Sequence, residues 1–112
     1  MGTFAYSDKV DVKFDDRTLA HLQVVIGAKL RRAESFYFTW PADPENNRRR
    51  STIWLNSTHC LVFEYEADTM PAINRSWIEI LNTSANSGSG LQLLEEPAPA
   101  LNLVPNKSKA TR

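Results

Sequence analysis

Arginine residues interleaved with aromatic residues are the part of this sequence best suited to chemistry. Three consecutive arginines end a polar ten-residue loop, residues 41–50, and aromatic residues stand on both sides of it. Cations that follow phosphates and flat rings that stack on bases together bind single-stranded nucleic acid. The sequence therefore predicts a nucleic-acid site. Its residues are Tyr37, Trp40, Arg48, Arg49, Arg50 and Trp54.

A second interpretation of the same residues is purely structural. The aromatic rings would pack a sheet and the arginines would be solvated. Zero formal net charge, from 13 basic and 13 acidic side chains, is also unusual for a dedicated nucleic-acid binder. Both interpretations stay open at this point.

Histidine and cysteine are too sparse to predict a catalytic or metal site. His59 and Cys60 are adjacent, but neighbours on a strand point to opposite faces, so they form no nucleophile–base pair. We expect Cys60 to be a buried strand residue, and His21 to lie on a helix surface or in a hydrogen bond. Two histidines and one cysteine without ligand spacing predict no metal, and we expect no cofactor.

Two further motifs have structural explanations. The glycine-rich stretch 87–90 follows a predicted helix, whereas a phosphate-binding loop precedes one, so we interpret it as a helix cap and turn. Glu64 and Glu66 alternate on a predicted strand, which favours a solvated face over a paired acid and base with Glu79. We therefore expect no catalytic residue and no enzymatic activity.

Length and composition limit the class of protein. A chain of 112 residues has room for one domain, and 42% hydrophobic with 23% charged residues is typical of globular domains. No apolar run approaches the roughly 20 residues of a membrane helix. The first 15 residues show no apolar leader, and one cysteine suits a reducing compartment, so we expect a cytoplasmic protein.

Charge is unevenly distributed along the chain. Residues 17–50 carry seven basic and three acidic side chains, and residues 64–96 carry one basic and six acidic side chains. If these segments occupy different faces, the molecule is bipolar, which favours self-association or a charged partner. Alternatively, the signs alternate by chance on solvated faces.

The first half of the chain predicts a hairpin and a helix. Alternation in residues 3–14 indicates two strands, and Asp15 with Asp16 can cap a following helix. One helical face carries apolar residues, and Gly27 inside that helix suggests close backbone packing. The face consists of Leu19, Leu22, Ile26, Leu30 and Ala33, widened by Ala20, Val24, Val25 and Ala28.

The second half predicts three strands, a helix and a last strand. The strands cover residues 35–40, 51–56 and 60–66, and the last covers 91–95. Asn74 is the expected N-cap of the helix, with Ile73 and Ile78 as a hydrophobic staple and Gly88 as a left-handed C-terminal cap. The buried helix face consists of Trp77, Ile78, Leu81 and Ala85.

These elements define an α+β fold of the order ββ-α-βββ-α-β. We expect two amphipathic helices to cover one face of a mainly antiparallel sheet. Residues 1–96 form the single domain, and residues 97–112, which contain three prolines, form a disordered tail.

A family resemblance rests on stretches spread across residues 1–97. They are residues 1–3 (MGT), 15–23 (DDRTLAHLQ), 28–32 (AKLRR), 34–36 (ESF), 51–55 (STIWL), 73–79 (INRSWIE), 84–87 (SANS) and 90–91 (GL). In this order they resemble a family of short uncharacterised actinobacterial proteins. Its members are often labelled "ATP-dependent DNA ligase".

The ligase label implies a motif that this chain lacks. ATP-dependent ligases resemble one another in a Lys-x-Asp-Gly motif, and the nearest match, residues 9–12 (KVDV), has no glycine. A ligase catalytic domain also needs far more than 112 residues. We expect a small non-catalytic binding module whose partner is single-stranded nucleic acid. The alternative is a protein-interaction or homodimerisation domain, and neither involves a membrane.

Overall fold

The computed structural model describes residues 1–8, 10–42, 49–58 and 60–98. It confirms the α+β class and the predicted order of elements. The helices are α1 (Asp16–Arg31) and α2 (Arg75–Ala85). The strands are β1 (Gly2–Tyr6), β2 (Val10–Phe14), β3 (Phe36–Pro41), β4 (Arg50–Leu55), β5 (Leu61–Glu64) and β6 (Leu91–Gln92).

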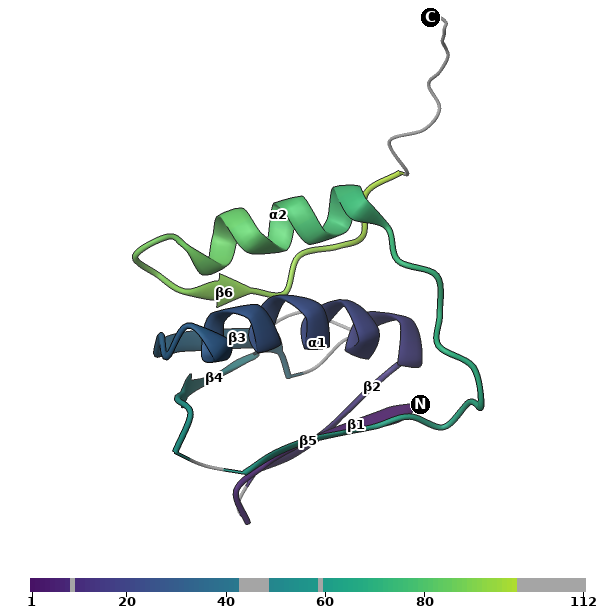
Figure 1. Ribbon diagram of the computed structural model, residues 1–112, viewed down its shortest axis with the longest axis horizontal. Helices are drawn as coiled ribbons and strands as arrows, with labels where there is room; N and C mark the ends of the chain where they lie inside the picture. The colour runs from purple at the N-terminus through teal and green to yellow at the C-terminus, as the bar shows by residue number, and fades with distance from the viewer. Residues whose placement is uncertain (9, 43–48, 59, 99–112) are drawn as a thin grey trace, which may run out of the picture.

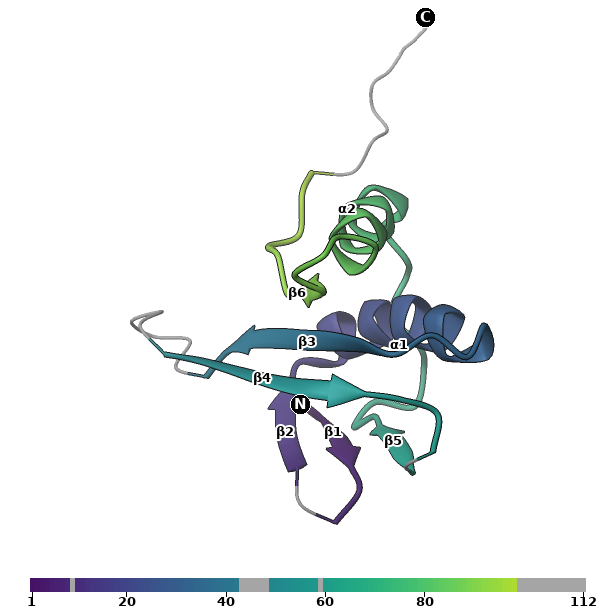
Figure 2. The ribbon, with the colours of Figure 1, turned by 90° about the vertical axis from the view of Figure 1, so that its left-hand side faces the viewer.

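The described strands form two three-stranded sheets where the sequence analysis expected one. The first has the order β2-β1-β5 and the second has the order β4-β3-β6. All pairings are antiparallel except that of β3 with β6, which is parallel. Figure 1 shows α1 between α2 and the first sheet, and Figure 2 shows β3 and β4 as a ribbon running beside α1.

Aromatic side chains join the two sheets in one core. Phe4 of the first sheet meets Phe38 of the second edge-on, with ring centroids 5.6 Å apart. Phe14 meets Trp40 in the same way at 6.4 Å. Edge-to-face packing at these distances is favourable for aromatic pairs. The sheets are therefore two parts of one hydrophobic core, which also contains the buried faces of both helices.

Helix α1 begins where the sequence predicts, but its apolar face is narrower. The Asp15 carboxylate accepts a hydrogen bond from the Thr18 amide at 3.0 Å, as an N-cap should. Val24 was expected on the buried face and is instead 45% exposed. Gly27 was expected to pack closely, but a Cβ built there would meet no atom within 4 Å.

Helix α2 confirms its predicted start and corrects its predicted end. The Asn74 side chain caps it by accepting from the Ser76 amide, and Trp77, Leu81 and Ala85 are buried. Ile73 is exposed and lies outside the core that Ile78 joins. The left-handed glycine is Gly90, with φ of 85°, and not Gly88. A Cβ at Gly90 would lie 2.5 Å from the Tyr37 carbonyl oxygen, so this close approach also requires glycine.

A hydrogen bond reaches past residue 96, the predicted end of the domain. Pro97 was assigned to the tail, yet its carbonyl accepts a hydrogen bond from the Asn74 side-chain amide at 3.0 Å. The remainder of the predicted tail, residues 99–112, lies outside the described residues. In the described part of the chain, neither helix is long and apolar enough to cross a membrane.

Truncating the buried face of α1 should be costly. Leu22 and Ile26 are fully buried, so Leu22→Ala and Ile26→Ala should each lower the free energy of unfolding by roughly 2–5 kcal/mol. The exposed Val24→Ala serves as the control and should change it by at most about 0.5 kcal/mol. Urea denaturation measures all three. Equal losses in the three variants would mean that this helix face is wrongly assigned.

Filling the open position in α1 should stabilise the protein. Glycine inside a helix costs up to about 1 kcal/mol relative to alanine, and Gly27 has room for a methyl group. Gly27→Ala should therefore raise the urea midpoint. Gly90→Ala is the contrasting variant, and it should lower the midpoint because of the close Tyr37 backbone. A lower midpoint for Gly27→Ala would contradict the open environment.

Candidate functional site

The β4-β3-β6 sheet presents one face to solvent, and alternation decides which side chains lie on it. Side chains two residues apart on a strand share a face, so Arg50, Thr52 and Trp54 of β4 point the same way. All three are exposed, whereas Leu55 is buried. We name this surface the open face. Its side chains are those of Tyr37, Arg50, Thr52 and Trp54, which are exposed, of Gln92, which is half-buried, and of Thr39, which is buried at the centre.

Strand register arranges the open face in rows. Tyr37 lies opposite Trp54 at one end, and Pro41 lies opposite Arg50 at the other. In the middle row Thr39 lies between Thr52 and Gln92. The Thr39 and Thr52 hydroxyls form a hydrogen bond at 2.8 Å. At about 3.3 Å per residue, the aromatic end and the Arg50 end are separated by about 13 Å.

The aromatic end consists of the cross-strand pair Tyr37 and Trp54, which lies outside the hydrophobic core. Tyr37 is 49% exposed and Trp54 is 48% exposed. Their ring centroids are 4.9 Å apart, and the rings are inclined by 69°. Each ring supports the other edge-on, and this leaves ring surface accessible to a ligand.

The structure separates Trp40 from this pair. Trp40 is 6% exposed, and its ring packs against Phe38 and Phe14 in the core. A buried ring cannot stack on a base lying on the sheet face, although Trp40 also lines the pocket at the Arg50 end. The two described arginines, Arg49 and Arg50, are exposed at the start of β4. Arg48 lies outside the described residues.

A pocket of about 470 Å³ opens at the Arg50 end. Thr39, Arg50 and Gln92 of the open face line it, and Glu95 lines it from the segment after β6. The pocket therefore combines a guanidinium, a hydroxyl, an amide and a carboxylate. Thr39, Gln92 and Glu95 were not predicted as site residues, because the parallel pairing of β3 with β6 brings Thr39 and Gln92 together and Glu95 follows on the next segment.

A smaller pocket of about 270 Å³ adjoins the aromatic end, and its cation is already paired. Lys29 contacts the Glu34 carboxylate at 2.7 Å, donates to Asn86 at 2.9 Å and lies over the Phe36 ring. Hydrogen bonds from Arg32 and Lys29 lower the pKa of Glu34 to about 2. Lys29 thus joins α1 to the end of α2 and is a structural cation.

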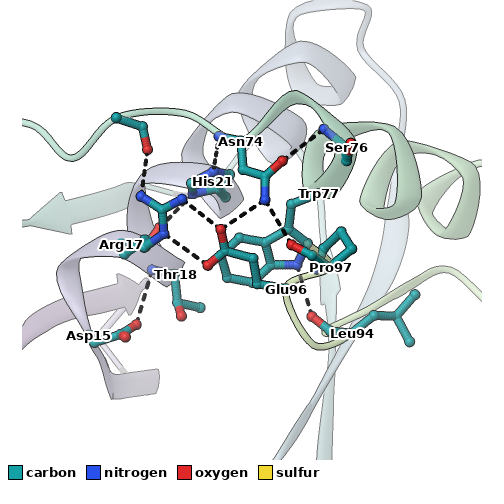
Figure 3. Close-up of polar contacts among 11 residues, drawn as sticks. Asp15, Arg17, Thr18, His21, Asn74, Ser76, Trp77, Leu94, Glu96 and Pro97 are labelled. Atoms are coloured by element: carbon teal, nitrogen blue, oxygen red, sulfur yellow. Dashed lines mark hydrogen bonds and ion pairs between the residues drawn. The ribbon is translucent and has the colours of Figure 1, made fainter. Parts of the chain in front are cut away.

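The segment that carries Glu95 is anchored by an ion pair to α1. Arg17 holds the Glu96 carboxylate with two hydrogen bonds, Nε to Oε1 at 2.8 Å and Nη2 to Oε2 at 2.6 Å (Figure 3). The Asn74 side-chain amide donates to the same carboxylate at 2.9 Å. The Trp77 indole donates to the Leu94 carbonyl at 2.9 Å. These contacts fix the backbone on both sides of Glu95.

His21 belongs to the same anchor, and of the two expectations for it the hydrogen-bonded histidine is confirmed and the helix-surface one is wrong. His21 is fully buried beside the Trp77 ring, with ring centroids 4.5 Å apart. Its Nδ1 lies 2.7 Å from the Arg17 carbonyl, and its Nε2 lies 2.8 Å from the Asn74 amide nitrogen (Figure 3). A carbonyl only accepts and an amide N–H only donates, so the proton is on Nδ1. Nδ1 therefore holds the ring on α1, and Nε2 positions the start of α2.

The remaining candidates that the structure describes lie apart from the open face. Cys60 was expected to be buried in a strand, but it is exposed and precedes β5. His59 lies outside the described residues. Glu66 is exposed as expected and pairs with the terminal amino group of Met1. In the described ranges, no three His, Cys, Asp or Glu side chains gather closely enough to hold a metal ion.

These observations describe a small α+β protein with an exposed aromatic and basic sheet face. Comparison with family models identifies its family: residues 1–96 match the model described as "Domain of unknown function (DUF7882)". The chain belongs to this family, which agrees with the resemblance to an uncharacterised family in the sequence analysis. Searches of curated proteins and of solved structures returned no significant match.

The anchor should make stability depend on pH in a defined window. Hydrogen bonds from Arg17, and then from Asn74, lower the pKa of Glu96 from 4.5 to about 2. A lowered carboxyl pKa stabilises the folded state above pH 4.5, and this contribution is lost as pH falls from 4.5 towards 2. Glu96→Gln should cost about 1 kcal/mol at pH 7. The difference from the wild type should disappear near pH 2.

Urea denaturation at several pH values measures this difference, and Glu95→Gln is the matched control. Glu95 is the exposed neighbour of Glu96 and forms no ion pair with a described residue. Its substitution should leave the unfolding free energy within about 0.5 kcal/mol of the wild type. Glu34 titrates in the same window in every variant, so its contribution cancels in the comparison. Equal effects of Glu95→Gln and Glu96→Gln would contradict the anchoring role.

Proposed function

We propose that this protein is a non-catalytic module that binds single-stranded nucleic acid on the open face. The observation that carries the proposal is the shared face of Tyr37, Trp54 and Arg50. Two half-exposed rings lie at one end of the face and an exposed guanidinium at the other. Stacking on aromatic rings and pairing with phosphates are the two interactions that such ligands need.

The difference in burial among the three tryptophans supports the proposal. An exposed tryptophan on a sheet leaves apolar area in water, and the same chain buries its other two tryptophans, Trp40 and Trp77. Trp54 is therefore the tryptophan available to a ligand. Its neighbour across the sheet, Tyr37, is exposed to nearly the same degree. A pair of rings in register offers a stacking surface larger than either ring alone.

The geometry favours a single strand over a duplex. A sheet face reaches bases only when they are unstacked and splayed onto it, because a duplex hides the flat sides of its bases. Arg49 and Arg50 supply charge at one end of the face, where phosphates of the same strand can lie. Few cations are involved, so affinity should be moderate and dependent on salt.

A second candidate function is homodimerisation. Among the described residues β4 pairs only with β3, so one edge of β4 has no strand beside it. An unpaired edge can add a strand from a second copy. The opposed charges of residues 17–50 and 64–96 would favour such contact between copies. The same aromatic residues would then form part of a protein interface.

Catalysis is not part of the proposal. The family's ligase label would require a lysine that accepts an adenylate, and the chain has no Lys-x-Asp-Gly motif. We propose a binding role without a cofactor, in the cytoplasm, where single-stranded nucleic acid is present.

Substitutions on the open face should weaken binding to a labelled oligothymidylate, measured by fluorescence anisotropy. One base stacked on an aromatic side chain contributes about 1–3 kcal/mol, so Trp54→Ala should raise the Kd by roughly five- to 150-fold. Changing Arg49 and Arg50 together to serine should reduce the logarithmic salt slope by about 1.4, or 0.7 for each lost phosphate contact. Folding stability should change by at most about 1 kcal/mol for the arginine pair.

The matched control changes Arg31 and Arg75 to serine. Both are exposed and neither lies on the open face, so the net charge changes equally while the salt slope should be kept. Equal losses in the two double variants would show that binding depends on net charge only. If sedimentation shows a concentration-dependent dimer and the oligonucleotide does not bind, the second candidate is favoured.

A further inference from the structure

The pocket at the Arg50 end is continuous with the open face. Thr39, Arg50 and Gln92 belong to both, so a strand that crosses the face from the aromatic pair reaches this pocket. Its volume of about 470 Å³ lies within the range of small-ligand sites. A single nucleobase can therefore enter it while the neighbouring bases stack on Tyr37 and Trp54.

The Glu95 carboxylate in the lining decides which hydrogen-bonding groups the pocket can bind. Glu95 lines it, while the next side chain, Glu96, is held by Arg17. The backbone on either side of Glu95 is fixed through the Leu94 carbonyl and the Pro97 carbonyl. In the described part of the chain Glu95 and Arg50 form no ion pair with each other or with another residue. The Glu95 carboxylate is thus free to accept hydrogen bonds from a ligand.

A carboxylate on a nucleic-acid surface repels phosphates, so a role in reading a base explains its place better than a role in general affinity. An ionised carboxylate only accepts hydrogen bonds. Guanine presents two adjacent donors on one edge, N1–H and the 2-amino group, which match the two oxygens of a carboxylate. Adenine, cytosine and thymine each present a single donor on that edge.

We propose that this pocket reads one base of the bound strand and selects guanine. Glu95 accepts from guanine N1–H and the 2-amino group. The Gln92 amide lies in the same pocket and offers a donor for guanine O6, whereas the buried Thr39 hydroxyl is already hydrogen-bonded to Thr52. This inference rests on the proposed function, since the base arrives as part of a strand held by the open face.

The test compares short oligothymidylates that differ only in one central base. Thymine, guanine, adenine, cytosine or hypoxanthine occupies this position, and fluorescence anisotropy gives each Kd. The guanine oligonucleotide should bind about tenfold more tightly than the thymine one. Hypoxanthine keeps N1–H and O6 but lacks the 2-amino group, so it should lose much of this preference.

Glu95→Gln is the decisive variant. An amide has one acceptor and one donor group, so it cannot match two donors, and the guanine preference should disappear. Affinity for plain oligothymidylate should be unchanged or slightly higher, because a negative charge has been removed. Glu64→Gln, on the exposed side of β5, removes the same charge away from the pocket and should keep the preference.

The outcomes separate this inference from the proposed function. Equal binding of all five oligonucleotides, still weakened by Trp54→Ala, would overturn the guanine pocket and leave the open face as the binding site. A preference that survives Glu95→Gln would also overturn it. An absence of binding to every oligonucleotide would overturn both proposals.

Discussion

The contact between Arg17 and Glu96 is the constraint on which the open face depends. Strand β6 is two residues long, too short to fix the chain that follows it. The bidentate pair joins that chain to the first turn of α1, and Asn74 and His21 join both to the start of α2. Several charge-assisted bonds on one carboxylate contribute more than an isolated surface pair. The Leu93 amide still donates to the Thr39 carbonyl of β3 at 2.9 Å, so the pair mainly fixes the chain beyond Leu94, where Glu95 lies.

Strand alternation explains why one short sheet can supply both a core and a binding surface. Phe36, Phe38 and Trp40 face inwards, so the residues between them must face outwards. The β4-β3 register then places Trp54 beside Tyr37 and Arg50 beside Pro41. A shift of one residue would bury Trp54 and expose Leu55, which the core would not tolerate. The composition of the open face is therefore a consequence of how the core is packed.

Local patterns predicted most of the elements, and non-local contacts account for the errors. The hairpin, both N-caps and the inward side of β3 follow from nearest neighbours in sequence, so they could be predicted. The division into two sheets depends on where β5 and β6 pair, and alternation carries no information about partners. The two alternatives for His21, a helix surface or a hydrogen bond, could not be decided from the sequence, because the Asn74 amide that donates to its Nε2 lies 53 residues away. The candidate site shows the same limit. Its aromatic and arginine residues could be found from the sequence, whereas Glu95 could not, because the pairing of β6 with β3 and the anchor together bring it to the pocket that Arg50 lines.

The ion-pair partners of individual residues explain how the uneven charge along the chain is distributed in the fold. The excess of basic residues in 17–50 is partly neutralised within the fold, since Arg17 pairs with Glu96 of the acidic segment, while Lys29 and Arg32 share Glu34 of their own segment. What is left at the β4 end of the sheet is a small local excess, Arg49 and Arg50, on a molecule with no net charge. Long-range attraction to a polyanion is then weak, and contacts within a Debye length of about 10 Å must supply the binding energy. The affinity of such a surface for nucleic acid comes more from stacking and base contacts than from charge. On a surface of this kind a carboxylate such as Glu95 costs little affinity and can contribute selectivity.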